Sequence, residues 1–324
     1  MKLSLLLKAC GIDLPSFLKD GGAHDPDILS LASDSRNVRP GSLFIAVEGI
    51  KADGHEYIGQ AIKKGASAVI AQRNPENQDA VILVDHSRKA MAGLAAAFYG
   101  NPSESLVLVG VTGTNGKTTT TWILEGIFRA AGFNTGVIGT VNIHYNGKTF
   151  DTPVTTPDSI DLQKTLAEMK AAGVTHVVME VSSHGIDLNR VDFCRFDAGI
   201  FTNLTQDHLD YHKNLEDYFQ CKRRFFTEFL GAKGKNNAPA VLNIDHEKGE
   251  VLFNSLDCKK ISISTAKRAD IYTRDIRDDI NGLSGTLCFG GTAVQFSSAL
   301  TGRFNLENIL CAAGAARALG IEPA

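Results

Sequence analysis

The sequence predicts an α/β protein of two domains, the second built on a mostly parallel sheet. Three observations support this fold class. Apolar segments of strand length alternate with segments of helical period, which is typical of parallel sheets covered by helices. The 324 residues suffice for two ordinary domains. Residues 100–103, Gly-Asn-Pro-Ser, interrupt both helix and strand, so we predict one domain over 1–101 and another over 102–324.

The composition argues against several classes of function. Apolar residues make up 43% and charged residues 21%, as in globular proteins. A net charge of −3 gives no reason to expect nucleic-acid binding. No apolar run approaches the ~20 residues that span a bilayer, and the N-terminus fits a small amphipathic helix better than a signal peptide. Six scattered cysteines suggest free thiols in a reducing compartment. These features fit a cytoplasmic protein that does not bind membranes. We also expect it to be a monomer.

The first domain is predicted to be small. Strands are expected at 42–47, 66–71 and 80–84, and helices at 57–64 and 87–99. The residue types alone predict no chemistry here. Ser33, Ser35 and Arg36 would form a capped turn as readily as a binding site.

The second domain has the alternation of a sheet with helices on both faces. Strands are expected at 106–111, 135–138, 175–179 and 197–202, and helices after residue 118 and at 158–172 and 215–230. Two prolines make 151–157 a rigid loop. Ligands of such sheets bind beyond the carboxyl ends of the strands, so the polar residues at those ends are the candidate site.

Residues 106–121 place a β-branched strand, a glycine loop and a helix in succession. This order suits a phosphate-binding loop, because glycines admit phosphate close to the backbone and the helix N-terminus supplies free N–H donors. Lys117 would contact the β- and γ-phosphates, and Thr118 would bind Mg²⁺. The general pattern has glycine where this chain has Val111. A tight turn with a solvated lysine is the alternative.

Further candidates follow neighbouring strands. Glu180 directly follows an apolar strand, where a carboxylate could bind Mg²⁺, although a simple charge at a strand end is the alternative. His208 and His212 have the spacing of a zinc helix, but Leu209 stands where that motif requires glutamate; for His212 we favour a structural role. Lys222 belongs to a run of three basic residues, which is usually a solvated helix face.

At this point a family resemblance becomes specific. GVTGTNGKTTT resembles the loop of the Mur ligases, ATP-dependent enzymes that form amide bonds in peptidoglycan precursors. Folylpolyglutamate synthetases have a similar loop. DSR-x-V-x-PG-x-LF and ADG-H-x-Y-I resemble the uridine-binding domain of MurE-type members, which add the third residue of the stem peptide. EVSSHG, HLDYH and GxFNxxN resemble other segments of these enzymes. The resemblance covers essentially the whole chain, whereas the enzymes have a third, C-terminal domain that we expect to be absent here.

The resemblance implies a ligase that adds meso-diaminopimelate or L-lysine to UDP-MurNAc-L-Ala-D-Glu. ATP would phosphorylate the D-Glu carboxylate, and the amino group of the diamino acid would attack the acyl phosphate. Without a third domain we expect the chain alone to be inactive. Two alternatives remain: a folylpolyglutamate synthetase-like ligase, against which the uridine-type domain argues, and a noncatalytic nucleotide-binding module.

The resemblance also assigns residues to ligands. The ATP contacts would be Gly113, Thr114, Asn115, Gly116, Lys117, Thr118, Thr119, Asn305 and Asn308. The substrate contacts would be Ser33, Ser35, Ile50, Lys51, Ala52, Thr155, Thr156, Ser182 and Arg190. The metal ligands would be Thr118, Glu180, His208 and Lys222, the last three of which, with Lys117, would also be catalytic.

In this family the lysine at the place of Lys222 is carbamylated. The chemistry is reasonable, because a desolvated lysine has a lowered pKa, only its neutral amine adds CO₂, and the product is an anionic oxygen ligand. Two positions depart from the family pattern: Leu188 and Val154 stand where some members have Gln and Asn. For the segment that contains Asn305, an ordinary helix N-cap remains the alternative.

Overall fold

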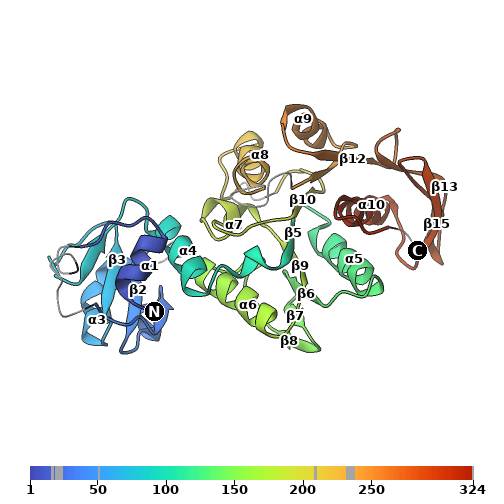
Figure 1. The fold of residues 1–324 in the computed structure, drawn as a ribbon. Coiled ribbons are helices and arrows are strands. Elements are labelled where there is room, and N and C mark those ends of the chain that lie inside the picture. Colours follow the sequence, from blue (N-terminus) through green and yellow to red (C-terminus); the bar gives the residue numbers. More distant parts are fainter. Residues whose placement is uncertain (16–17, 19–24, 50–51, 208–209, 231–237, 323–324) are drawn as a thin grey trace. The chain divides into compact units, whose positions relative to one another are not determined.

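The computed structural model describes the chain except residues 16–17, 19–24, 50–51, 208–209, 231–237 and 323–324 (Figure 1). The chain forms two compact units. The first contains Met1–Pro102, Asp158–Ala167 and Leu188–Phe193, and the second contains Ser103–Pro157, Glu168–Asp187 and Cys194–Ala324. Among the described residues, no helix has both the length and the apolar character needed to cross a membrane.

In the described part of the first unit, four parallel strands pair in chain order. They are β1 (Ser30–Ala32), β2 (Ser42–Ile45), β3 (Ala68–Ala71) and β4 (Val81–Leu83). The helices are α1 (Leu3–Ala9), α3 (Ile58–Lys63) and α4 (Ser87–Phe98), with 3₁₀ turns η1 (Ser35–Asn37) and η2 (Gly54–Tyr57). The strands and helices predicted for this domain are confirmed, with ends that differ by at most two residues.

The central strands of this sheet are buried on both faces. Every residue of β2 and β3 is buried. Leu43 and Ile45 face a core shared with α1 and α4, whereas Phe44 faces a second core that contains Ile58 of α3. Because both faces are covered, β2 and β3 are continuous apolar runs rather than alternating ones.

In the described part of the second unit, eleven strands form one sheet in the order β15-β14-β13-β12-β11-β10-β5-β9-β6-β7-β8. Neighbours from β13 to β6 are parallel, and an antiparallel hairpin extends each end. The strands are β5 (Val107–Thr112), β6 (Thr135–Ile138), β7 (Ile143–Tyr145), β8 (Lys148–Phe150), β9 (His176–Glu180), β10 (Ala198–Phe201), β11 (Ala240–Asn243), β12 (Lys260–Ser264), β13 (Ile271–Asp279), β14 (Gly282–Phe289) and β15 (Thr292–Ser298). The predicted α/β class with a mostly parallel sheet is confirmed.

Helices connect these strands. They are α5 (Lys117–Ala130), α6 (Ser159–Ala171, whose residues belong to both units), α7 (Ser183–Asp187), α8 (Leu215–Arg224), α9 (Glu247–Ser255) and α10 (Arg303–Ala318), with a short turn η3 (Pro102–Glu104). α5 and α10 pack together over one core of the sheet. The helix predicted at 215–230 is interrupted, because Phe225–Phe229 form a π-helical turn, η4, after α8.

Gly110 has a packing role inside β5. Gly110 and Gly199 are paired across β5 and β10. A Cβ atom at Gly110 would overlap the ring of Phe225, and one at Gly199 would lie 2.8 Å from the same ring. The first glycine of the motif therefore makes room for a buried phenylalanine of η4, and the phosphate-loop geometry begins three residues later.

Candidate active site

The loop between β5 and α5 depends on two glycines. Gly113 has a φ of +147° and Gly116, the N-cap of α5, has a φ of +82°. A side chain at Gly113 would overlap the hydroxyl of Thr202, and one at Gly116 would overlap the amide oxygen of Asn308. Both the backbone angles and the lack of space therefore require glycine. The first turn of α5, which includes Lys117, Thr118 and Thr119, presents backbone N–H groups that have no acceptor within the helix.

The loop is fixed by the segment that follows β10. The N–H of Thr114 donates to the carbonyl of Asn203 at 3.0 Å, and the N–H of Asn115 donates to the Asn203 side chain at 3.0 Å. The Thr202 hydroxyl donates to the Asn115 carbonyl at 2.6 Å, and the N–H of Thr205 donates to the Thr114 hydroxyl at 3.0 Å. Sequence reasoning did not single out Asn203, although its place directly after a strand beside β5 was a usable signal.

Glu180 is the centre of the site. Its side chain ends β9 and is 1% exposed. The Thr118 hydroxyl donates to its Oε1 at 2.9 Å, and the N–H and hydroxyl of Thr140 donate to Oε1 and Oε2, each at 2.9 Å. Three donors offset the cost of burying a carboxylate. Thr140 was missed by the sequence analysis, because nothing in its local pattern shows that the end of β6 lies beside β9.

The threonines of the proline-containing loop reach the same strand end. The hydroxyls of Thr140 and Thr155 lie 3.1 Å apart. The buried hydroxyl of Thr156 donates to the Glu180 carbonyl at 2.9 Å and accepts from the N–H of Ser182 at 3.0 Å. Thr155, Thr156 and Ser182 are therefore brought together with Glu180. Arg190 belongs to the first unit.

Two lysines donate to one carbonyl. Lys117 Nζ lies 3.1 Å from the carbonyl oxygen of Gly113 and 2.8 Å from that of Thr114. Lys222 Nζ lies 2.9 Å from the same Gly113 oxygen, with its ammonium 4.5 Å from the centre of the Tyr218 ring. The Lys222 side chain is 1% exposed. A run of basic residues on a helix usually faces solvent, whereas Lys222 is buried.

The surroundings lower the pKa of both amines. Burial lowers the pKa of Lys222 well below its usual range, and the charge of Lys117 lowers it further. Burial also lowers the pKa of Lys117, although the carboxylates of Glu180 and Asp207 oppose this shift. Burial raises the pKa of Tyr218 to about 12, so its hydroxyl stays protonated. The more deeply buried Lys222 is therefore the amine that loses its proton more readily.

Of the two predicted histidines, only His212 belongs to the part of the chain that the structure describes. His208 lies outside the described residues. His212 is buried, its Nδ1 lies 3.7 Å from Asp217, and its ring centre is 5.0 Å from that of Tyr218. Burial lowers the pKa of His212. Within the described residues, no group of three or more His, Cys, Asp or Glu side chains could hold a metal ion.

The start of α10 contacts the glycine loop. Gly302 is the N-cap of this helix, so neither Asn305 nor Asn308 is the cap residue. The buried Asn308 accepts from the Thr120 hydroxyl at 3.3 Å and donates to Asn305 at 3.4 Å. Asn308 is therefore packed against the loop, and Asn305 supports it.

A pocket of 510 Å³ lies within the first unit. Its lining includes three predicted residues, Ser33, Ser35 and Ala52, and also Tyr57 and Gln60. The hydroxyl of Ser35 donates to Gln60 at 2.8 Å. The predicted Ile50 and Lys51 lie outside the described residues. Tyr57 and Gln60 were missed because they lie in and after a turn whose sequence predicts only a helix.

Comparison with known proteins gives two family matches. Residues 111–316 match the family model described as the Mur ligase middle domain. Residues 27–99 match the model described as the Mur ligase family, catalytic domain.

Curated relatives match over most of the chain. The UDP-N-acetylmuramoyl-L-alanyl-D-glutamate–2,6-diaminopimelate ligase of Geobacter metallireducens is 44% identical over 94% of this chain and 60% of its own length. The ligase of the same name from Bacillus licheniformis is 41% identical over 99% of this chain and 65% of its own length. The chain thus spans less than two thirds of the length of these relatives.

Solved structures share the fold. A structure of a UDP-N-acetylmuramoyl-L-alanyl-D-glutamate–2,6-diaminopimelate ligase superposes with a TM-score of 0.84 at 26% identity, over 99% of this chain and 65% of that one. The Mycobacterium tuberculosis folylpolyglutamate synthase, complexed with ADP and AMPPCP, gives a TM-score of 0.60 at 17% identity, over 72% of this chain and 59% of that one.

Proposed function

The chain belongs to the Mur ligase family, and from this premise we propose that it supplies the UDP-substrate site and the ATP site of a MurE-type ligase. The full reaction would join a diamino acid to UDP-MurNAc-L-Ala-D-Glu at the expense of ATP. Both curated relatives described above are named as 2,6-diaminopimelate ligases, which favours meso-diaminopimelate over L-lysine. We also propose that the protein acts as a monomer in the cytoplasm.

One observation carries the proposal. The buried Glu180 carboxylate accepts hydrogen bonds from Thr118, on the phosphate-loop side, and from Thr140, which contacts Thr155 on the proposed peptide side. Phosphoryl transfer needs its donor and acceptor to be held at one place. A single buried acid that joins both sides supports such an arrangement at the end of β9.

The residues present fit Mg·ATP. The oxygen donors Thr118 and Glu180 suit Mg²⁺, which prefers hydroxyl, carboxylate and phosphate oxygens. Gly113 and Gly116 have no room for a side chain, and phosphate would approach the backbone at these two residues. When bound, Mg²⁺ would neutralise charge on the phosphates.

The chain's own residues would then have separate roles in the reaction. Lys117 would turn from the carbonyls of Gly113 and Thr114 to the phosphates and offset their charge. The γ-phosphoryl group would pass to a D-Glu carboxylate oxygen, leaving ADP. The diamino acid's amine would form the amide bond by attacking the carbonyl carbon, losing a proton as phosphate leaves. The proposed peptide contacts are Thr155, Thr156, Ser182 and Arg190. The proposed uridine diphosphate site is the pocket of the first unit.

Lys222 would act as a carbamate. Its burial and lowered pKa support the neutral amine that CO₂ requires. The nitrogen would form a bond to the CO₂ carbon and release a proton, giving an anionic oxygen ligand. Together with His208 this group would complete the proposed metal site.

A two-ligand titration tests the proposal. We expect the 324-residue chain to bind both UDP-MurNAc-L-Ala-D-Glu and Mg·ATP in calorimetry. Lys117→Ala should abolish Mg·ATP binding and leave the UDP-substrate affinity unchanged, whereas Lys213→Ala, at an exposed lysine, should change neither. Unchanged ATP affinity in Lys117→Ala would refute the phosphate-loop assignment. Binding of ATP without the UDP-substrate would favour the folylpolyglutamate synthetase-like alternative, and binding of neither by a folded sample would favour a noncatalytic module.

A further inference from the structure

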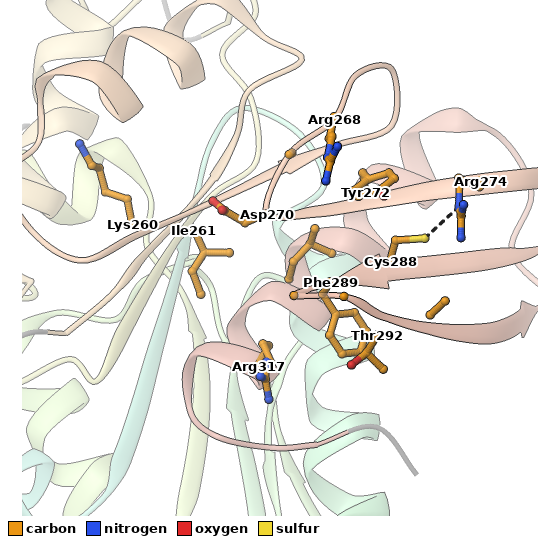
Figure 2. A pocket seen from close by; sticks show the side chains of 15 residues that line it. Lys260, Ile261, Arg268, Asp270, Tyr272, Arg274, Cys288, Phe289, Thr292 and Arg317 are labelled. Carbon is orange, nitrogen blue, oxygen red and sulfur yellow. Dashed lines mark hydrogen bonds between the residues drawn. The ribbon is translucent and has the colours of Figure 1, made fainter.

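A second cavity, of 560 Å³, lies beside the β13–β15 hairpins (Figure 2). None of the residues assigned above to ATP, Mg²⁺ or the peptide substrate lines it. One lining residue, Arg317, is nine residues after Asn308 on α10, which places it about 13 Å farther along the helix axis. Because Asn308 contacts the glycine loop, the cavity lies toward the opposite end of α10.

Basic side chains outnumber acidic ones in the lining of this cavity. Four basic residues, Lys260, Arg268, Arg274 and Arg317, face one acid, Asp270. Asp270 already accepts from the N–H and hydroxyl of Ser262 at 2.8 and 2.6 Å. The chain as a whole carries a net charge of −3, so the excess of positive charge is a local feature.

Two of the four cations are held by other groups. Lys260 Nζ donates to the carbonyls of Phe253 and Leu256 at 2.7 and 2.8 Å, at the end of α9. Arg317 forms an ion pair with Glu322. Neither charge is therefore fully available to a ligand in the cavity.

The other two cations, Arg268 and Arg274, are less engaged. In the part of the chain that the structure describes, neither forms an ion pair with a carboxylate. Arg274 Nε donates to the sulfur of Cys288 at 3.3 Å, which leaves its terminal N–H groups for another acceptor. Figure 2 shows Arg268 and Arg274 on either side of Tyr272.

The rest of the lining is apolar or aromatic. Ile271, Cys288 and Phe289 are buried and form part of the wall, and Tyr272 is partly exposed. Guanidinium groups bind phosphate with two parallel hydrogen bonds, and aromatic side chains accept flat rings. The volume lies in the range of small-molecule sites.

We propose that the cavity bounded by Arg268, Tyr272, Arg274 and Phe289 is an additional ligand site, which binds a phosphorylated small molecule of mononucleotide size. Arg268 and Arg274 hold the phosphate, and the partly exposed Tyr272 contacts the planar part. The site is separate from the proposed ATP site and does not depend on it.

Titration of AMP and of inorganic phosphate into Lys117→Ala protein tests this site with the phosphate loop weakened. We expect AMP to bind more tightly than phosphate. The double variant Arg268→Gln/Arg274→Gln should weaken AMP binding about tenfold or more, because charge-assisted hydrogen bonds are roughly twice as strong as neutral ones. Arg277→Gln, on β13 but outside the cavity lining, is the matched control and should bind AMP normally.

A second measurement keeps the proposal testable if the double variant does not fold. Tyr272 lines the cavity and is partly exposed, so bound AMP should slow its nitration by tetranitromethane, followed by mass spectrometry of the peptide that contains Tyr272. Absence of AMP binding, equal affinity for AMP and phosphate, an equal loss in Arg277→Gln, or no protection of Tyr272 would each overturn the proposal.

Discussion

At the scale of single residues, the least expected feature is the Gly113 carbonyl, which accepts from both Lys117 and Lys222. Two ammonium groups at one acceptor repel each other, and burial adds to the cost of their charge. Sequence reasoning could name both lysines, one from its loop and one by resemblance. It could not show their shared partner, because that depends on how α8 packs against the loop.

Carbamylation of Lys222 should depend on pH in a defined direction. Its folded-state pKa is lowered by burial, so the amine is neutral above that lowered value and protonated below it. We therefore expect intact protein mass under native conditions with CO₂ to exceed the sequence mass by one CO₂, with the excess lost as pH falls through the folded-state pKa. Lys222→Arg should show no added mass, and Lys213→Arg should keep it. An added mass that persists in Lys222→Arg would contradict the assignment.

Thr140 offers a test of the Glu180 arrangement. Thr140→Val removes a hydroxyl that donates to Glu180, and leaving a buried acceptor short of a partner costs about 1–3 kcal/mol. We expect lower stability to urea and weaker Mg-dependent ATP binding, with Thr140→Ser close to wild type. Thr149→Val, at an exposed position of β8, controls for the substitution itself. Equal behaviour of the Val and Ser variants would show that the hydroxyl has no role.

At the scale of elements, the parallel strands that were predicted are short apolar runs bounded by polar or glycine residues. The parallel strands β1, β11 and β12 and the antiparallel extensions were not predicted. β7 and β8 have three residues each, and β13 and β15 are largely exposed, so neither pair has a strong apolar pattern. The turn signal was nevertheless present, since Asn146 and Gly147 both have positive φ, as tight hairpin turns require.

Gly110→Ala should test the packing of η4 on β5. The added Cβ would overlap the Phe225 ring, and overpacking of this kind costs about 1–3 kcal/mol. We expect a lower urea midpoint. Gly126→Ala, in α5, places its Cβ where no other atom lies within 4 Å, so it should instead be neutral or stabilise the protein by up to about 1 kcal/mol. A Gly110→Ala midpoint at or above wild type would mean that η4 can shift to make room.

At the scale of the whole molecule, the sequence indicated two domains and their order. It did not indicate that residues 158–167 and 188–193 would join the first compact unit, because their patterns continue those of the second. The glycine loop was predictable from its motif, and the structure shows why positions 113 and 116 require glycine. The role of Thr140 was not predictable, because it arises from strand order alone, whereas the place of Asn203 directly after a strand was a signal that the prediction did not use.

The two units should respond separately to substitution. Tyr57→Ala removes an aromatic wall of the pocket in the first unit. We expect about tenfold weaker binding of UDP-MurNAc-L-Ala-D-Glu, since stacking of a base on an aromatic ring is worth ~1–3 kcal/mol, with Mg·ATP affinity unchanged. Leu83→Ala, exposed and outside that pocket, serves as the control. Equal losses for both ligands would indicate damage to the fold.

The contacts between the glycine loop and Asn203 have a consequence for how the two segments can change in evolution. Asn203 meets Thr114 and Asn115 through both its backbone and its side chain, although 88 residues separate Asn115 from Asn203. A substitution of Asn203 removes the side-chain oxygen that accepts from the Asn115 N–H and the side-chain N–H that donates to the Asn115 carbonyl, whereas the backbone contact with Thr114 is kept. Changes at residue 203 should therefore be tolerated more readily in descendants in which the loop has changed as well, and a recombinant that takes the two segments from lineages that differ at residue 203 should be less stable than either parent.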